Sequence, residues 1–406
     1  MTDGSSSEAE VEASLEELVD LCEACGIEVV AKDMQKRPAP DAATAAGQGK
    51  ISELGHMAKS LGANTLVFDG KLSGSQMANI AELSELKVLD RTLLILDIFA
   101  RRASTSEGVL QVEIAQLRDR LTRLAGSGEA LSRLGGGIGT RGPGESKLES
   151  DRRHIQRRIT VLRKKLKELE LRRDLVRRRR GEREAINIAV CGYTNAGKSS
   201  LINALCDTDL QAFDQVFATL DPRARRLPIE GPEILLSDTV GFIRKLPHEL
   251  VESFRSTLDE IRYADLIIQV TDISDPDAAN ACAVVEDTLK ELKADQKPRL
   301  HVFNKMDLLS PRAREVLLFR PRPPENVKEC FVSVADGYGM DDLRQTLLDL
   351  ISQKWSTLEE VLLHQEQAKL EAIRQSGWIK SLSYEDDGIH IKYKAPQATL
   401  DRLAKM

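Results

Sequence analysis

The chain has 406 residues, which is enough for two to four domains that each bury a core. Charged residues make up 30% of it and aromatic residues only 4%, so the composition indicates a helix-rich soluble protein and argues against a β-sandwich or a membrane protein. No apolar run is long enough for a membrane span, and the amino terminus lacks the basic and apolar regions of a signal peptide. We therefore expect a cytoplasmic protein with reduced cysteines.

Residues 1–103 alternate between helical and short apolar stretches. This alternation predicts a small N-terminal parallel α/β domain, because strands joined through helices build a parallel sheet. The segment Gln35–Lys50 is rich in Pro, Ala and Gly and predicts a loop. We expect helices over Glu10–Cys25, Ile51–Leu61 and Ser75–Glu85, and strands over Ile27–Ala31, Thr65–Phe68 and Val88–Leu89.

Residues 104–183 carry two heptad patterns. Apolar residues in steps of three and four form a seam along a helix, and two such seams predict an antiparallel helical hairpin. Between the helices, residues 125–147 contain eight glycines and predict a long, functional tip loop. The seams consist of Leu110, Ile114, Leu117, Leu121 and Leu124, and of Ile155, Ile159, Leu162, Leu166, Leu169 and Val176.

The second helix of this hairpin is strongly basic. The formal net charge of the chain is −6, yet between Asp151 and Arg183 there are 15 Lys and Arg against 5 acids. A basic rod with a flexible tip predicts a polyanionic partner, and folded RNA suits its length. The alternative interpretation, a charged helix face exposed to solvent, would explain many of these arginines but not the glycine-rich tip loop. The candidate RNA-binding residues are Arg133, Arg141, Lys147, Arg152 and Arg153.

A G-x-x-x-x-G-K-S loop lies between the apolar run Ile186–Cys191 and a helical stretch that starts at Ser200. Its glycines allow the backbone amides to wrap a phosphate chain, its lysine supplies a charge for the outer phosphates, and its serine can ligate Mg²⁺. Strand before and helix after are the context that a true phosphate loop requires. The loop residues are Gly192, Tyr193, Thr194, Asn195, Ala196, Gly197, Lys198 and Ser199.

Residues 184–355 read as a doubly wound phosphate-loop domain, whose ligand contacts follow the strands. After the strand Ile234–Leu236 come Asp238, Thr239, Val240 and Gly241, where Asp238 can reach Mg²⁺ through water and the Gly241 amide can sense a γ-phosphate. After the strand Leu300–Phe303 come Asn304, Lys305, Met306 and Asp307. The Asp307 carboxylate can accept from N1 and the 2-amino group of guanine, so it would select GTP over ATP. Further strands are expected at Leu266–Val270 and Cys330–Val332.

These motifs together resemble the HflX-type GTPases, a ribosome-associated branch of the phosphate-loop class, and the likeness covers nearly the whole chain. The resemblance implies GTP hydrolysis with Mg²⁺ and binding of the large ribosomal subunit by a monomer. Outside the loops given above, it rests on Val88–Thr92, Ile95–Ala100, Gly135–Glu145, Asp151–Ile155, Phe217–Asp221 and Phe242.

The resemblance also assigns roles to single residues. It implies that Thr219, within Phe217, Ala218, Thr219, Leu220 and Asp221, binds Mg²⁺ and closes over the γ-phosphate in the GTP state. It implies base contacts from Ser333, Val334 and Ala335, and catalytic roles for Lys198, Thr219 and Gly241. Val334 stands where alanine is usual, which adds two methyl groups beside the guanine.

Two residues bear on the rate of hydrolysis. Phe242 stands where many GTPases place a glutamine that orients the attacking water, so slow intrinsic hydrolysis is expected, with the missing group supplied from outside. Asn195 is either a K⁺ ligand, as in several related GTPases, or an asparagine that tolerates a left-handed turn.

Residues 356–406 form a small α+β C-terminal appendix. A helix is expected over Leu358–Arg374, and two strands, Ile379–Ser383 and Ile389–Tyr393, around the turn Glu385–Gly388. The appendix either contacts a ribosomal protein or caps the GTPase domain.

The function that these features favour is a GTPase that separates stalled or idle ribosomes into subunits in its GTP form and is released by hydrolysis. One alternative is a GTP-regulated switch that binds RNA or protein without splitting ribosomes. Another is an ATP-driven RNA remodeller built on the amino-terminal domain, although residues 1–103 lack a phosphate loop.

Overall fold

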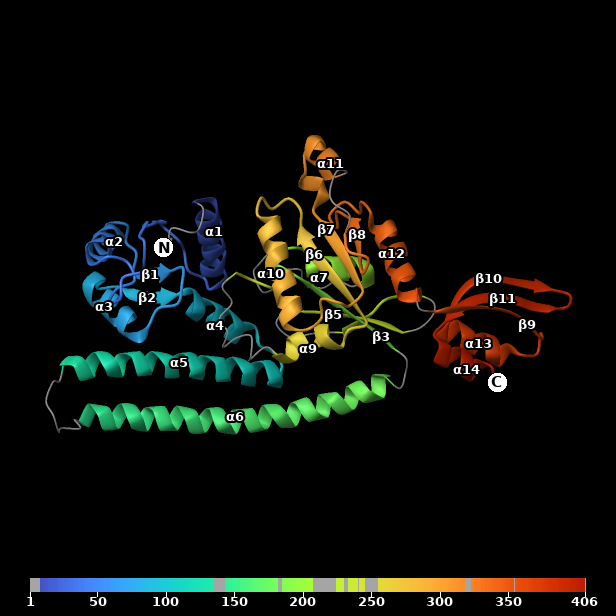
Figure 1. Ribbon diagram of the computed structural model, residues 1–406, viewed down its shortest axis with the longest axis horizontal. Coiled ribbons are helices and arrows are strands. Elements are labelled where there is room, and N and C mark those ends of the chain that lie inside the picture. The colour runs from blue at the N-terminus through green and yellow to red at the C-terminus, as the bar shows by residue number, and fades with distance from the viewer. Residues whose placement is uncertain are drawn as a thin grey trace. The chain divides into compact units, whose positions relative to one another are not determined.

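A computed structural model gives the fold of the chain (Figure 1), which divides into two compact units. The first unit contains Met1–Arg172 and Ile243–Ser256, and the second contains most of the remaining chain. The structure describes residues 8–134, 143–181, 185–206, 224–229, 233–239, 241–244, 255–317, 323–353 and 355–405.

The amino-terminal domain is a parallel pair of strands with helices around it. Thr65 pairs with Lys87 and Phe68 with Asp90, and Ile51 and Ile80 bring two helices into the core beside the strands. The expected strand over Ile27–Ala31 is wrong: these residues are irregular and form no ladder with β1, so this apolar stretch has no backbone partner in the described sheets. The elements are α1 (Glu8–Ala24), α2 (Gln48–Ser60), β1 (Thr65–Phe68), α3 (Gly74–Ser84), β2 (Lys87–Asp90) and α4 (Arg91–Arg102).

Asp90, the last residue of β2, and Arg91, the first residue of α4, form buried ion pairs within this domain. Asp90 caps α4 by accepting from the Leu93 amide at 3.0 Å, and it forms an ion pair with Arg123 at 2.9 Å. Arg91 is only 2% exposed and pairs with Asp69 at 2.7 Å and with Glu17 at 3.0 Å. Each buried charge is therefore compensated, which a charge removed from water requires.

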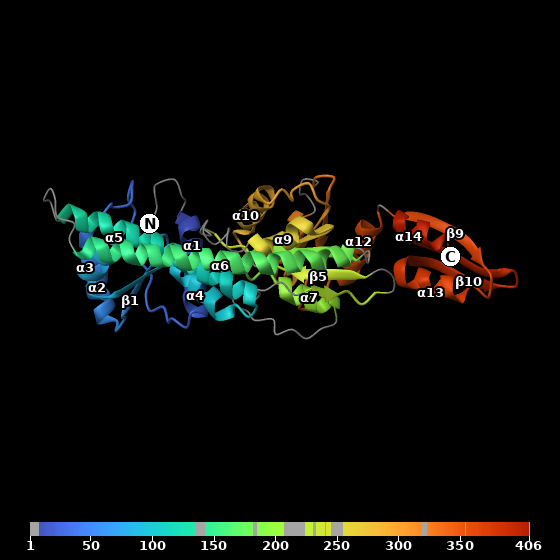
Figure 2. The same ribbon diagram turned by 90° about the horizontal axis from the view of Figure 1, so that it is seen from below.

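Two long helices, α5 (Ser106–Leu134) and α6 (Pro143–Gly181), form the predicted antiparallel hairpin, in which they run side by side in both views (Figures 1 and 2). Ile114, Ile155, Ile159 and Leu162 are buried along the predicted seam. Arg158 of α6 forms an ion pair with Glu113 of α5 at 2.8 Å.

The tip loop is shorter than residues 125–147. α5 continues to Leu134 and α6 begins at Pro143, so only residues 135–142 lie between the helices, and these fall outside the described residues. The helix-forming residues Ala, Leu, Glu and Arg allow α5 to continue past the isolated Gly126 and Gly128. Pro143 suits the first position of α6, because an N–H at that position has no acceptor within the helix and proline lacks the N–H.

The second unit contains a six-stranded sheet of order β4-β5-β3-β6-β7-β8, in which only β4 is antiparallel. The strands expected from the sequence are present, and the short edge strand β4 is an addition. The strands are β3 (Ile186–Gly192), β4 (Ala224–Arg226), β5 (Ile234–Asp238), β6 (Leu266–Asp272), β7 (Arg299–Asn304) and β8 (Val327–Phe331).

Helices cover both faces of this sheet (Figure 1). α7 (Lys198–Cys206) and α12 (Met340–Ser352) pack on one face, where Leu201 and Leu343 are fully buried. α9 (Arg255–Tyr263) and α10 (Ala278–Glu291) lie on the other, and the shorter η1 (Met306–Leu308) and α11 (Pro311–Leu317) follow β7. The carboxyl ends of the parallel strands are thereby left to the loops, where doubly wound folds bind their ligands.

The carboxyl-terminal domain is a three-stranded antiparallel sheet of order β10-β11-β9 with two helices on one face. The two expected strands and their turn are present, but the helix expected over Leu358–Arg374 is wrong up to Glu366, because β9 runs to Leu362 and α13 begins only at Gln367. Leu358, Val361 and Leu362 have helical spacing, yet this stretch pairs with β11 and Leu362 is buried opposite Ile389. The elements are β9 (Ser356–Leu362), α13 (Gln367–Ser376), β10 (Trp378–Glu385), β11 (Gly388–Ala395) and α14 (Gln397–Leu403).

Candidate nucleotide site

The phosphate loop leaves β3 at Gly192 and enters α7 at Lys198, and its backbone demands small residues. Gly192 and Gly197 have φ of +152° and +90°. A methyl group on Gly192 would come within 2.1 Å of the Val270 carbonyl oxygen, and one on Gly197 within 2.3 Å of Asn304 Nδ2. Asn195 is exposed with φ of 59°, a left-handed conformation that asparagine tolerates.

Lys198 is buried inside the loop that it follows. Its Nζ donates to the Tyr193 carbonyl oxygen at 2.6 Å, so the ammonium group points back into the cradle. Burial lowers its pKa to about 8, and Asp238 opposes this shift. A phosphate group in the loop would favour the charged form.

Two oxygen ligands for a divalent cation lie together beside this lysine. Ser199 at the start of α7 donates to Asp238 Oδ2 at the end of β5, at 2.9 Å. Asp238 is 3% exposed. A hydroxyl and a carboxylate are ligands that Mg²⁺ prefers, so the donor set fits the ion, which would neutralise phosphate charge when bound.

The segment after Asp238 returns to the phosphate loop. Thr239 bonds the Val190 carbonyl oxygen through its hydroxyl at 2.8 Å. The Phe242 amide donates to the Gly192 carbonyl oxygen at 3.0 Å, and the Thr194 amide donates to the Phe242 carbonyl oxygen at 2.8 Å. A methyl group on Gly241 would lie 2.9 Å from Thr194 Cγ2 and 3.1 Å from Lys198 Nζ. There is therefore little room for a side chain between Gly241 and the phosphate loop.

Three loops meet on the base side of the site through Asn304, which is 3% exposed. Its Nδ2 donates to the Ala196 carbonyl oxygen at 3.0 Å, and its Oδ1 accepts from the Val334 amide at 3.2 Å. The exposed Asp307 accepts from the Ser333 hydroxyl at 2.8 Å, and Met306 is buried beneath it. Ala335 is exposed at the end of the third loop. The arrangement holds a carboxylate ready for a base without occupying both of its oxygens.

Sequence reasoning missed Asp272. It lies at the carboxyl end of β6 and forms an ion pair with Lys305 at 2.7 Å, while Lys305 itself has φ of +66°. This contact fixes the lysine of the Asn304–Asp307 loop. The signal was available, because an acidic residue that ends a central parallel strand lies at the ligand-binding edge of a doubly wound sheet.

Several predicted residues cannot be placed in this geometry. Val240 and the segment Phe217–Asp221, with Thr219, lie outside the described residues, as does Arg141. Arg133 and Lys147 belong to α5 and α6, respectively, but their side chains are not described. Arg152 and Arg153 are exposed on α6, where Arg153 pairs with Glu149 at 2.6 Å.

Three family models match successive parts of the chain. They are described as the GTP-binding GTPase N-terminal region over residues 12–100, its middle region over 102–180, and a 50S ribosome-binding GTPase over 187–305. GTPase HflX of Caldanaerobacter subterraneus is 42% identical over 398 residues, which cover 98% of this chain and 91% of that protein. The chain belongs to the HflX family. It is a GTPase.

A second curated relative agrees with this assignment. GTPase HflX of Escherichia coli is 38% identical over 398 residues, covering 96% of this chain and 92% of that protein. A GTP-binding protein from Sulfolobus solfataricus, solved in complex with GDP, is 25% identical and covers 83% of this chain and 95% of its own, with a TM-score of 0.45. The family assignment rests on the sequence relatives.

Membership of the phosphate-loop GTPases agrees with the donor set at Ser199 and Asp238, since these HflX-family enzymes belong to a class that generally uses Mg²⁺. The helices in the described parts of the chain include none with the length and apolar character needed to cross a membrane.

Proposed function

We propose that this protein binds the large ribosomal subunit in its GTP form and separates stalled or idle ribosomes into subunits, and that hydrolysis resets and releases it. The observation that carries the proposal is the joining of a nucleotide site to a long basic hairpin in one chain. The family description of a 50S ribosome-binding GTPase supports the choice of partner.

The proposed RNA contact is the outer face of α6. At a rise of about 1.5 Å per residue, its 39 residues span about 58 Å, enough to reach well into a folded RNA. Ile155, Ile159 and Leu162 of the seam are buried against α5, while the cations are exposed and suit contacts with phosphates. The exposed cations are Arg152, Arg153, Arg157, Arg158, Arg163, Lys164, Lys165, Lys167 and Arg172.

The proposed switch acts through the loops around the γ-phosphate. In the GTP state the Gly241 amide and, by resemblance, Thr219 would close on the γ-phosphate, and the contacts of Phe242 with Gly192 and Thr194 would carry that closure into the following segment. Binding of the GTP form to the ribosome then supplies the free energy for subunit separation. Loss of the γ-phosphate on hydrolysis releases the loops.

Hydrolysis by the isolated protein is proposed to be slow. Phe242 is 4% exposed, so its ring packs in the interior and offers no group to orient water. The missing group would come from the ribosome, with K⁺ at Asn195 as a second candidate. The left-handed φ of Asn195 also suits an asparagine without any such role.

The test is a sucrose-gradient assay of intact ribosomes with GTP, GDP and a non-hydrolysable GTP analogue. We expect free subunits with GTP and with the analogue, and none with GDP. A matched pair of variants asks whether α6 is the contact: Arg163, Lys164 and Lys167 changed to Gln, against Lys87, Lys290 and Lys328 changed to Gln. Each triple variant loses three positive charges. Only the α6 variant should fail to separate ribosomes, and its ribosome affinity should depend less steeply on salt concentration. Ribosome binding without separation by the wild-type protein would favour the alternative, a GTP-regulated binding switch.

A further inference from the structure

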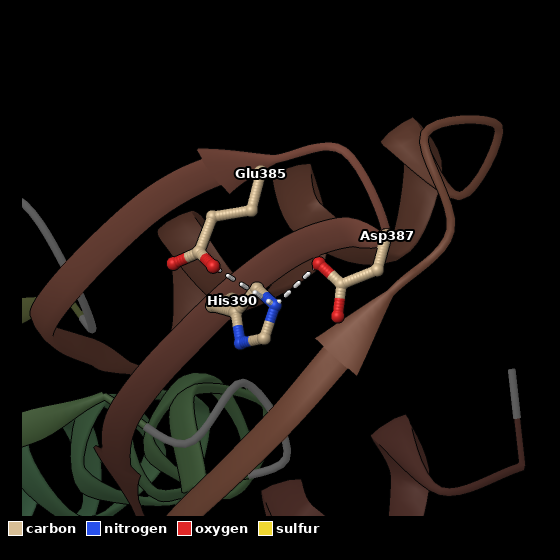
Figure 3. A group of neighbouring side chains, drawn as sticks. All are labelled: Glu385, Asp387 and His390. Carbon is tan, nitrogen blue, oxygen red and sulfur yellow. Dashed lines mark hydrogen bonds and ion pairs between the residues drawn. The ribbon is translucent and has the colours of Figure 1, made fainter.

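A second cluster of metal-ligating side chains lies in the carboxyl-terminal domain, away from the motifs of the nucleotide site. Glu385 ends β10, Asp387 lies in the turn and His390 lies on β11, and their ligand atoms are all within 4.8 Å of one another. Figure 3 shows both carboxylates converging on one ring nitrogen of His390. That nitrogen, Nε2, is 2.9 Å from Asp387 Oδ1 and 3.8 Å from Glu385 Oε2.

These separations are close to those of ligands that share one ion. Two ligand atoms at about 2.0–2.2 Å from a common metal lie about 3.0–3.5 Å apart in tetrahedral or octahedral geometry. All three side chains are at least partly exposed, His390 at 35%, so small rotations can reach this spacing without disturbing a core.

The hairpin holds the three ligands in place. Glu385 pairs with Gly388 across the turn, and the Ser383 hydroxyl donates to Glu385 Oε1 at 3.0 Å, which leaves Oε2 toward the ring. Gly388 has φ of +147°, and a methyl group there would lie 2.6 Å from the Leu362 carbonyl oxygen, so the turn is seated against the end of β9. Oriented ligands with outer partners are what metal sites require.

We propose that Glu385, Asp387 and His390 form a binding site for a divalent transition-metal ion of the Zn²⁺ class. Imidazole nitrogen favours Zn²⁺ and its neighbours over Mg²⁺ or Ca²⁺, which take oxygen ligands. Two carboxylates, those of Glu385 and Asp387, supply the charge that the ion needs. The site is separate from the Mg²⁺ ligands Ser199 and Asp238.

The test is a Zn²⁺ titration of the full chain in competition with a chromophoric chelator, in excess GDP and Mg²⁺ so that the nucleotide site is filled. We expect wild type to bind Zn²⁺, and His390→Ala and Asp387→Asn each to raise the Zn²⁺ dissociation constant at least about tenfold, since losing even an outer partner of a ligand costs 10–100-fold. The matched controls are Asp386→Asn, the neighbouring acid of the turn, and His56→Ala, an exposed histidine of α2, and both should bind as wild type does. Circular dichroism checks that each variant folds.

A second measurement is independent of any variant. Crystals of wild type with Zn²⁺ should give anomalous difference density at the zinc edge between Glu385, Asp387 and His390. Any of three results would overturn the proposal. These are unchanged zinc binding in His390→Ala and Asp387→Asn, no zinc binding by wild type, and zinc density found only at other positions.

Discussion

Asn304 Nδ2 donates to the Ala196 carbonyl oxygen at 3.0 Å, which ties the loop after β7 to the phosphate loop. The same side chain accepts from the Val334 amide, so one buried amide connects the three loops that surround the nucleotide. Asn304 therefore links the loop proposed to bind the base to the loop proposed to bind phosphate.

Replacing Asn304 with Ala should weaken GDP binding about 5- to 150-fold. The change leaves a buried carbonyl and an amide without their partner, which costs about 1–3 kcal/mol. A titration with fluorescent GDP measures the effect. Asn326→Ala is the control, because Asn326 also bonds two carbonyl oxygens, those of Asp295 and Lys297. Equal losses in both variants would contradict a specific role of Asn304.

A methyl group on Gly241 should impair the switch. In Gly241→Ala the new carbon would press on Thr194 and Lys198, so we expect GTP hydrolysis with ribosomal subunits to fall at least about tenfold, about 1.4 kcal/mol of transition-state stabilisation. Phosphate release measures the rate. Gly70→Ala is the control, because a methyl group there meets nothing within 4 Å. Hydrolysis at the wild-type rate in Gly241→Ala would show that this contact is not needed.

Nucleotide binding should take up protons at alkaline pH. Burial lowers the pKa of Lys198 to about 8, and bound phosphates would favour the charged lysine, so nucleotide binding should raise that pKa. We expect GDP affinity to fall as pH rises above about 8, and to be nearly flat below about pH 7. Calorimetry at pH 8.5 in two buffers of different ionisation enthalpy should reveal uptake of a fraction of a proton. The absence of any buffer dependence would count against a depressed lysine.

The K⁺ proposal can be separated from the backbone role of Asn195. Asn195→Gly keeps the left-handed turn, since glycine adopts it freely, but removes the side-chain oxygen. If K⁺ is bound there, ribosome-stimulated hydrolysis should be faster in K⁺ than in Na⁺ for wild type only. Equal rates in both salts for wild type would exclude K⁺ from the mechanism.

The position of the candidate nucleotide-binding loops directly after strands could be predicted because their residue patterns are local. A cradle such as Gly192–Ser199 and a base-reading loop such as Asn304–Asp307 each need fixed residue types at short spacing, directly after a strand. The parallel sheet could be predicted from the apolar stretches that precede these loops. Asp272 was missed because its role depends on a neighbour from another strand.

Elsewhere the sequence was ambiguous where tertiary pairing decides the structure. Leu358, Val361 and Leu362 fit a helix by spacing, but pairing with β11 makes them a strand. Ile27–Ala31 is a short apolar stretch rich in β-branched residues, as in a strand, but it has no ladder partner among the described residues. Arg91 could not be recognised as a buried residue, because the acids that compensate it, Glu17 and Asp69, are distant in sequence.

The most direct test of the central claim compares two signals in one rapid-mixing experiment: light scattering, which falls when ribosomes separate, and release of phosphate from GTP. If GTP binding supplies the work, scattering should fall before phosphate appears, and it should fall equally with a non-hydrolysable analogue. Separation that follows phosphate release, or that fails with the analogue, would contradict the account.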